Sequence, residues 1–281
     1  MGETPTILVT GGSGQLGGEL VRRSRAAGWQ AVGTWLTHEM DGLQLDICDA
    51  QAVDSALAQV RPDVVVHTAY RFNGPEMHAV NVAGTANVAR AAGRAGARLI
   101  HVSTDVVFDG ESDRPYRESD EPRPITDYGR AKLAAEREVA ARDPVALIVR
   151  TSLLYGGARP GPHEQLVLDA LEGRRDVGFF TDEVRCPVHV GDLADALLQL
   201  ARSSESGVVH AAGAEAVSRF EFAQLVAAAH GHDPAGVRAA ESAAQDVTRP
   251  LNCALDSGLL AARYGRRLRG VREVLAAPDL H

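Results

Sequence analysis

A tyrosine and a lysine four residues apart provide the groups needed for acid–base chemistry. Tyr128 and Lys132 form a Y-x-x-x-K pair, which places both on one face of a predicted helix over 126–142. A phenol ionises near pH ~10, and a neighbouring ammonium brings its pKa toward the working range. Thr104 ends a predicted strand over 98–104, where its hydroxyl can bond a substrate carbonyl. These three residues form the candidate catalytic set, with Tyr128 as the proton donor.

Three glycines early in the chain have the spacing of a dinucleotide-binding turn. Gly11, Gly14 and Gly17 lie between a predicted strand over 6–10 and a predicted helix that starts at Gly14. Gly11 allows the tight turn, Gly14 lets backbone N–H groups approach a pyrophosphate, and Gly17 lets the helix lie close to the strand. The strand-to-helix context predicts a bound dinucleotide.

The end of the second predicted strand, 30–35, governs the choice between the two nicotinamide cofactors. An acid there would grip the ribose of NADH and repel the 2′-phosphate of NADPH, and this chain has none. Thr34 and His38 offer hydrogen-bond donors but no guanidinium. We therefore expect NADPH or NADH to work, with NADPH modestly favoured, by about tenfold. Asp46 closes a predicted strand over 43–46 and can reach the adenine amino group.

The elements around these motifs indicate a doubly wound parallel (Rossmann) α/β sheet with a smaller C-terminal substrate-binding region. Apolar strand-like runs alternate with amphipathic helical segments over residues 1–155, the predicted dinucleotide-binding domain. Residues 156–281 are predicted to be mainly substrate-binding, with 187–210 returning to the first domain. The predicted elements not yet given are strands 63–69, 145–152, 177–180 and 207–213, helices 50–60, 76–96, 163–173, 191–202 and 218–231, and a loop over 232–252.

Composition excludes several classes of function. The chain has 281 residues, a net charge of −8 and 45% hydrophobic residues. This acidic balance argues against a nucleic-acid partner, and no apolar run approaches the ~20 residues of a membrane span. The spacing of the cysteines and histidines fits no metal site. We expect a cytoplasmic protein without a secretory signal, and His67 and His101, both in apolar strands, are expected to be core residues.

Several longer stretches carry a resemblance to a known family. With the motifs above, they resemble the extended short-chain dehydrogenase/reductases, and within these the dTDP-4-dehydrorhamnose reductases and related sugar-nucleotide 4-ketoreductases. The stretches span nearly the whole chain: 10-TGGSGQLGGEL-20, 45-LDICD-49, 103-STDVVFDG-110, 116-YRESDEPRPITDYGRAKLAAE-136, 150-RTSLLYG-156, 182-DEVRCPVHVGDLA-194 and 249-RPLNCALDS-257.

The resemblance implies NAD(P)H-dependent reduction of the 4-keto group of a nucleotide-linked, dTDP-type 6-deoxysugar. It implies that Thr104, Tyr128 and Lys132 are catalytic, with Tyr128 and Lys132 also contacting the cofactor, and that a homodimer is possible. The residues that it places at the substrate are Thr104, Asp105 and Leu153. Those that it places at the cofactor, besides the residues above, are Gln15, Leu16, Ile47, Thr68, Ala69 and Tyr70.

Two departures from the family pattern keep other functions open. Val106 stands where a tyrosine is usual after the Thr-Asp pair, and Leu153 where an aromatic residue often faces the sugar nucleotide. One alternative is a non-catalytic dinucleotide-binding subunit that resembles the regulatory subunit of methionine adenosyltransferase. Another is a sugar-nucleotide epimerase or dehydratase with tightly held NAD⁺.

Overall fold

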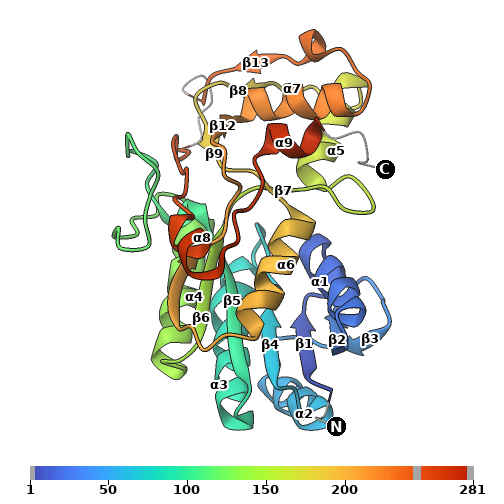
Figure 1. Ribbon diagram of the computed structural model, residues 1–281, viewed down its shortest axis with the longest axis vertical. Coiled ribbons are helices and arrows are strands. Elements are labelled where there is room, and N and C mark those ends of the chain that lie inside the picture. Colours follow the sequence, from blue (N-terminus) through green and yellow to red (C-terminus); the bar gives the residue numbers. More distant parts are fainter. Residues whose placement is uncertain (1–3, 243–247, 277–281) are drawn as a thin grey trace. The chain divides into compact units, whose positions relative to one another are not determined.

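The computed structural model describes residues 4–242 and 248–276 (Figure 1). The chain divides into two compact units. The first comprises Met1–Thr104, Asp127–Val149 and Ala194–Val209. The second comprises Asp105–Thr126, Arg150–Leu193 and His210–His281. The chain therefore crosses between the units several times, and one crossing directly follows Thr104.

The first unit is built on a seven-stranded sheet with the order β11-β6-β5-β4-β1-β2-β3. The pairs β1–β2, β1–β4, β2–β3 and β4–β5 are parallel. This arrangement confirms the predicted doubly wound α/β fold. The strands are β1 (Thr6–Thr10), β2 (Gln30–Trp35), β3 (Gly42–Gln44), β4 (Val64–His67), β5 (Arg98–Thr104), β6 (Leu147–Thr151) and β11 (Gly207–His210).

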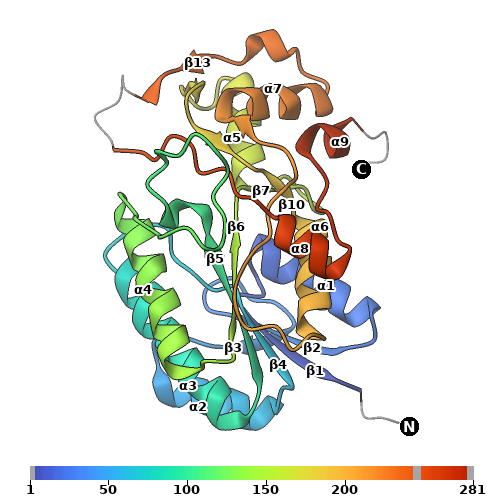
Figure 2. The ribbon, with the colours of Figure 1, turned by 60° about the vertical axis from the view of Figure 1, so that its left-hand side comes forward.

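Helices cover both faces of this sheet, as Figure 2 shows: α2, α3 and α4 lie on one face, and α1 and α6 on the other. Their bounds are α1 (Gln15–Ala26), α2 (Ala50–Val60), α3 (Thr85–Ala95), α4 (Asp127–Arg142) and α6 (Val190–Ala201). Asp49 caps α2, since its carboxylate accepts from the backbone N–H groups of Gln51 and Ala52. The chain order reverses between β1 and β4, the point where open α/β sheets place their ligands.

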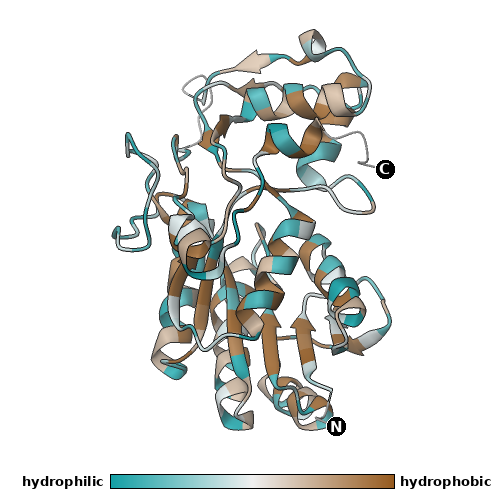
Figure 3. Cartoon of the chain, viewed as in Figure 1, coloured by the Kyte–Doolittle hydropathy of each residue, from teal (hydrophilic) through white to brown (hydrophobic). Residues whose placement is uncertain are grey.

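Apolar side chains between the sheet and the helices form the core of the first unit. Leu8 and Val65, on neighbouring strands, are 0% exposed and pack with Val53, Val88 and Val139 from α2, α3 and α4. The strands of the sheet are drawn largely in the colour of hydrophobic residues in Figure 3. A sheet that is buried on both faces explains why its strands appear in the sequence as continuous apolar runs.

The second unit is made of helices and strand pairs of two residues each. Its helices are α5 (Pro162–Leu171), α7 (Arg219–Ala229), α8 (Gly258–Tyr264) and α9 (Val271–Leu275), with short 3₁₀ turns η2 (Asp105–Val107) and η3 (Pro234–Gly236). The pairs are β7 (Leu154–Tyr155) with β10 (Val188–His189), β8 (Phe179–Phe180) with β13 (Ala239–Ala240), and β9 (Val184–Arg185) with β12 (Val217–Ser218). Its core gathers Tyr155, Phe179 and Phe222 with apolar residues of α5, α7 and α9.

Some elements differ from those expected from the sequence. The expected helix 76–96 starts as a π-helix, η1 (Ala79–Gly84), before it continues as α3. The third strand ends at Gln44, two residues before Asp46. The expected loop 232–252 contains η3 and β13, and its residues 243–247 lie outside the described part of the chain. Among the described residues, none of the helices combines the length and the apolar character that crossing a membrane requires.

Candidate active site

The glycine motif forms a tight turn between β1 and α1. Gly11 has a φ of 72°, in the region that favours glycine. A Cβ on Gly17 would lie 2.2 Å from the carbonyl oxygen of Gly11, so only glycine lets the first turn of the helix approach the strand this closely. Helix α1 begins after Gly14 without a side-chain cap, and its first turn carries no acidic residue. An uncapped helix N-terminus of this kind suits a phosphate.

The ends of the neighbouring strands meet this turn. A Cβ on Gly11 would lie 2.8 Å from the Cα of Ala69, just beyond β4. The Thr68 hydroxyl donates to the carbonyl oxygen of Thr10 at 2.7 Å. Thr34 is 1% exposed, and its hydroxyl oxygen accepts from the Gly11 N–H at 3.3 Å. Thr34 thus supports the glycine turn itself, a role that the sequence analysis did not consider.

The other residues predicted to contact the cofactor lie in different surroundings. Leu16 and Ile47 are buried, at 6% and 5% exposure, and Gln15 is half-buried. Asp46 is exposed, and its carboxylate accepts from the backbone N–H of Cys48 at 2.8 Å. Tyr70 is 58% exposed. Their role at a cofactor stays a prediction.

Two exposed aromatic side chains lie against the predicted proton donor. The ring of Phe72 is centred 4.9 Å from the ring of Tyr128, and that of Tyr70 is 6.1 Å from it. Between these two aromatics, both backbone polar groups of Arg71 bond to the buried amide of Asn81, at 2.9 and 2.7 Å. Asn81 therefore anchors the loop that holds two aromatic rings beside the Tyr128 phenol.

Lys132 lies one turn further along α4 and is only 3% exposed. Its ammonium donates to the backbone carbonyl of Val102 on β5 at 2.8 Å and lies 3.4 Å from Nε2 of His101. Burial lowers the pKa of Lys132 from 10.5 to about 8, and the neighbouring Glu136 carboxylate acts in the opposite direction. Lys132 thus changes its charge close to neutral pH, as a group that tunes an acid–base reaction should.

The residues predicted to touch the substrate are divided between the units. Thr104 ends β5 in the first unit and is half-buried. Asp105, the next residue, belongs to the second unit, where it is 4% exposed and accepts from the Ser152 hydroxyl at 2.6 Å. Val106 and Leu153 are half-buried. The buried Asp105 carboxylate therefore has a partner within its own unit.

Three arginines of the second unit gather around the buried Glu183. The guanidinium groups of Arg185 and Arg249 lie 3.8 and 3.4 Å from its carboxylate. The backbone N–H of Arg219 donates to the carbonyl oxygen of Glu183, and the Arg219 guanidinium lies 3.4 Å from the His163 ring. Burial lowers the pKa of Arg219 to about 10, so it stays a cation at neutral pH. Arg185 also lies 3.8 Å from the buried Asp105 carboxylate. Three cations beside two carboxylates leave one positive charge in excess, which suits a phosphate-containing ligand.

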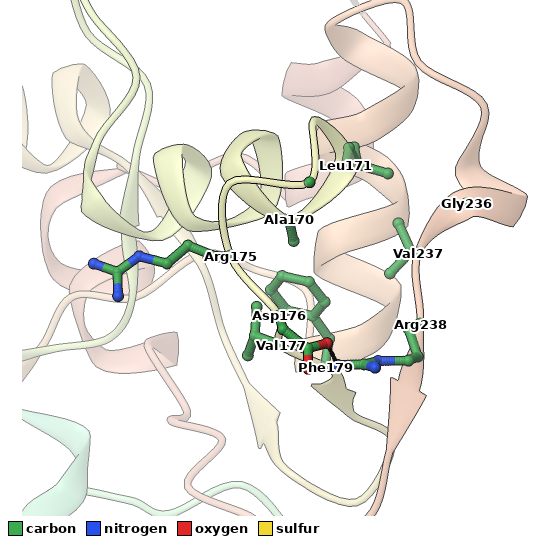
Figure 4. Close-up of a pocket in the computed structure, with 10 residues that line it drawn as sticks. Ala170, Leu171, Arg175, Asp176, Val177, Phe179, Gly236, Val237 and Arg238 are labelled. Carbon is green, nitrogen blue, oxygen red and sulfur yellow. Dashed lines mark ion pairs between the residues drawn. The ribbon is translucent and has the colours of Figure 1, made fainter.

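The second unit also contains a cavity of about 330 Å³ (Figure 4). Phe179, Leu171 and Val237 give it an apolar lining, and Arg238 pairs with Asp176 at its rim at 2.7 Å. The residues predicted to be catalytic are not among those that line it. Within residues 4–242 and 248–276, no set of three or more histidine, cysteine or acidic side chains is placed to hold a metal ion.

Comparison with known proteins decides the family. A family model described as the RmlD substrate binding domain matches residues 5–278. The chain belongs to the RmlD substrate-binding-domain family. It is 37% identical over 254 residues to a dTDP-4-dehydrorhamnose reductase of Mycobacterium tuberculosis, covering 86% of this chain and 81% of that protein. The resemblance expected from the motifs is thereby confirmed.

Solved structures and other relatives extend the comparison. The crystal structure of a dTDP-4-dehydrorhamnose reductase from Bacillus anthracis in complex with NADP superposes with a TM-score of 0.87, at 25% identity and 98% coverage of both chains. A relative of a different kind, the methionine adenosyltransferase 2 subunit beta of Bos taurus, is 31% identical over 276 residues, which are 90% of this chain and 81% of that protein. The relatives of this chain thus include proteins named as reductases and a protein named as a subunit of another enzyme.

Sequence reasoning missed several residues that the structure brings to these sites. Phe72 and Asn81 gave no periodic or motif signal. Arg185 and Arg249 lie in stretches used for the resemblance, but no role was assigned to them. One signal was available from composition alone: Lys132 is the only lysine in the sequence, beside 28 arginines.

Proposed function

We propose that this protein reduces the 4-keto group of a dTDP-linked 6-deoxysugar, with NADPH as the preferred reductant. The observation that carries the proposal is the pairing of Tyr128 with a buried Lys132 whose pKa is about 8, on a helix that packs against the strand ending at Thr104. The similarity to named dTDP-4-dehydrorhamnose reductases supports the choice of substrate.

The cofactor would lie on the uncapped N-terminus of α1 and the glycine turn. The tight approach of Gly17 to Gly11 and the absence of an acidic side chain in the first turn of α1 fit a bound pyrophosphate. The neighbouring strand ends contribute Thr68 and Ala69. When bound, NADPH supplies the hydride that adds to the carbonyl carbon of the substrate.

The chain's own residues handle the oxygen and its proton. The Thr104 hydroxyl donates a hydrogen bond to the carbonyl oxygen and orients it. The Tyr128 phenol gives its proton to that oxygen as it becomes an alkoxide. The Lys132 ammonium, one turn further along α4 than the phenol, makes the phenolate left behind less unfavourable. Phe72 and Tyr70 exclude water from the phenol by covering it with apolar surface.

The second unit would hold the nucleotide part of the substrate. The three arginines, Arg185, Arg219 and Arg249, outnumber the two carboxylates beside them, Glu183 and Asp105, and Arg219 and Arg249 are the candidates for contact with the diphosphate. Binding energy from that remote part would position the keto carbon for reaction. We assign the substrate region to this unit and the dinucleotide region to the first unit.

The choice between cofactors follows from the end of β2. The last residues of the strand and the exposed Leu36, Thr37 and His38 that follow it are not acidic, and Glu39 is the first acidic residue beyond β2. We expect kcat/KM with NADPH to exceed that with NADH by about tenfold, or ~1.4 kcal/mol. A strong preference for NADH would contradict this reasoning.

A panel of nucleotide-linked 4-keto sugars with each cofactor, followed at the absorbance of the nicotinamide, tests the proposal. Turnover of a dTDP-linked 4-keto-6-deoxysugar is the expected result. A chain that turns over none of them but forms a stable complex with another protein would act as a binding subunit. Nicotinamide that co-purifies with the protein would point to an epimerase or dehydratase. Sedimentation of the purified protein tests the expected homodimer, and fractionation of the source cells tests the expected cytoplasmic location.

A further inference from the structure

A buried histidine that has no part in the proposed reaction contacts the ammonium of the single lysine. His101 lies on β5, three residues before Thr104, and is 0% exposed. Its Nε2 is 3.4 Å from the Lys132 ammonium. An ammonium has only donors, so a hydrogen bond between them requires Nε2 of a neutral imidazole as the acceptor. We propose that His101 is a positioning residue that holds the Lys132 ammonium against β5 and stabilises its charged form.

The contact between His101 and Lys132 is one of two side-chain contacts that join β5 to α4 at this level. His101 and Ser103 are two residues apart on the strand and both face this helix, where Lys132 and Glu136 are four residues apart. The Ser103 hydroxyl donates to the Glu136 carboxylate at 2.5 Å, while His101 meets Lys132. The strand and the helix thus fix the ammonium and the carboxylate at defined places, one turn apart.

The second ring nitrogen of His101, Nδ1, indicates what the imidazole does in this position: the side chain serves as a hydrogen-bond acceptor through Nε2. If Nε2 accepts, Nδ1 carries the proton, and this buried Nδ1 has no hydrogen-bond partner in the described part of the chain. A buried donor without a partner destabilises the fold, and an apolar side chain at 101 would avoid that cost. The neighbouring His67, by contrast, has both ring nitrogens bonded, to the hydroxyls of Thr10 and Thr85.

Nε2 of His101 stays unprotonated, and so able to accept a hydrogen bond, over the working pH range. Burial and the charge of Lys132 drive the pKa of His101 well below its ordinary value, so the imidazole stays neutral. The titratable groups that face Lys132 are His101 from β5, His67 from β4 and Glu136 from α4. Of these, Glu136 stabilises the ammonium by its charge and His101 by a hydrogen bond.

Because Lys132 is the only lysine, its titration can be followed directly. Untagged protein labelled with ¹³C at lysine Cε gives one signal, whose shift with pH reports the pKa of Lys132 without substrate or cofactor. The inference rests on the proposed function for its catalytic meaning only, so a failed turnover assay leaves this measurement intact.

Removal of the acceptor should lower the pKa of Lys132. In His101→Leu the midpoint should fall by about one pH unit, the tenfold change in proton affinity expected when a charged group loses one hydrogen bond. In His101→Gln the amide oxygen reaches the place of Nε2, and the midpoint should return to within about 0.3 units of the wild type. The alkaline limb of kcat/KM should move with the midpoint in both variants.

Two further variants keep the test decisive. His67→Leu alters an equally buried histidine on the adjacent strand, and its midpoint should match the wild type. His101→Asn is the substitute if the leucine variant does not fold. Its amide is too short to replace Nε2, so the midpoint should fall by the same amount of about one pH unit. A wild-type midpoint in both the leucine and the asparagine variants of His101, or an equal fall in His67→Leu, would overturn the proposal.

Discussion

Replacing Lys132 with arginine keeps the positive charge, and it should nevertheless remove most of the activity. The lysine is 3% exposed, and its one nitrogen lies between the Val102 carbonyl and the His101 ring, at 2.8 and 3.4 Å. A planar guanidinium brings additional atoms into this closely packed site. Overpacking of this kind destabilises a fold by about 1–3 kcal/mol.

The protonation behaviour of the two side chains adds a second effect. Burial lowers the pKa of Lys132 from 10.5 to about 8, which corresponds to about 3 kcal/mol of disfavoured charge. Lysine escapes this cost above pH 8 by losing its proton, whereas arginine stays charged at all accessible pH values. The wild type should therefore lose kcat/KM above about pH 8, and Lys132→Arg should lack that alkaline limb in its residual activity.

Kinetics and thermal unfolding test this expectation together. In Lys132→Arg we expect kcat/KM to fall by roughly 10²–10⁴ and the Tm to fall by about 2–4 °C for each kcal/mol lost. Arg137→Lys, an exposed exchange on the same helix, is the matched control and should change neither quantity. An arginine variant that keeps kcat/KM within tenfold of the wild type, with its alkaline limb intact, would refute the reasoning.

Three other perturbations follow from the same structure. Tyr128→Phe should lower kcat by roughly 10²–10⁴ with little change in the dissociation constant of NADPH, and a variant that keeps most of its turnover would exclude the phenol as the proton donor. Gly17→Ala forces a Cβ to within 2.2 Å of the Gly11 carbonyl oxygen, whereas the Cβ of Gly18→Ala lies 3.2 Å from the Gly12 carbonyl oxygen. Calorimetric titration with NADPH should therefore show a much larger loss of affinity for Gly17→Ala than for Gly18→Ala. Equal losses would contradict the role of the turn. Four histidines that the fold holds in the neutral form (His67, His101, His163 and His210) have lowered pKa values, about 3 for His67 and His163 and about 4 for His210, so the unfolded chain binds more protons below pH ~6.5. Below about pH 5.5 the free energy of unfolding should then fall by ~5 kcal/mol for each pH unit, and acid unfolding should occur between about pH 4 and 5.5. Circular dichroism over a pH series would detect it, and a stability that is constant from about pH 7 to 4.5 would contradict it.

The first unit could be predicted from the sequence because its signals are local. Strands buried on both faces are continuous apolar runs, and β1, β2 and β5 have the bounds expected for them. The glycine turn was predictable for a related reason, since a positive φ at Gly11 and the close approach at Gly17 both demand glycine. Both features depend on residues that are near one another along the chain.

Contacts between distant segments left no such signal. Asn81 fixes Arg71 across ten residues and thereby places Phe72 beside Tyr128, yet neither the asparagine nor the phenylalanine stands in a motif. The strand pairs of the second unit have two residues per strand, too few to establish a period. Thr34 stood at the expected strand end, but its burial against Gly11 depends on how β1 and β2 pair.

The numbers of lysines and arginines carry information that the net charge does not show. Arginine serves wherever this chain needs a surface cation, in pairs such as Arg22 with Glu19 and Arg114 with Asp120. A guanidinium is adequate there because an exposed ion pair needs only a charge. The one lysine is buried, its pKa is lowered to about 8, and its ammonium is more compact than a guanidinium. We therefore predict that, in a chain with 28 arginines, the single lysine occupies a position at which arginine could not support proton transfer, and that position is the fourth residue after Tyr128.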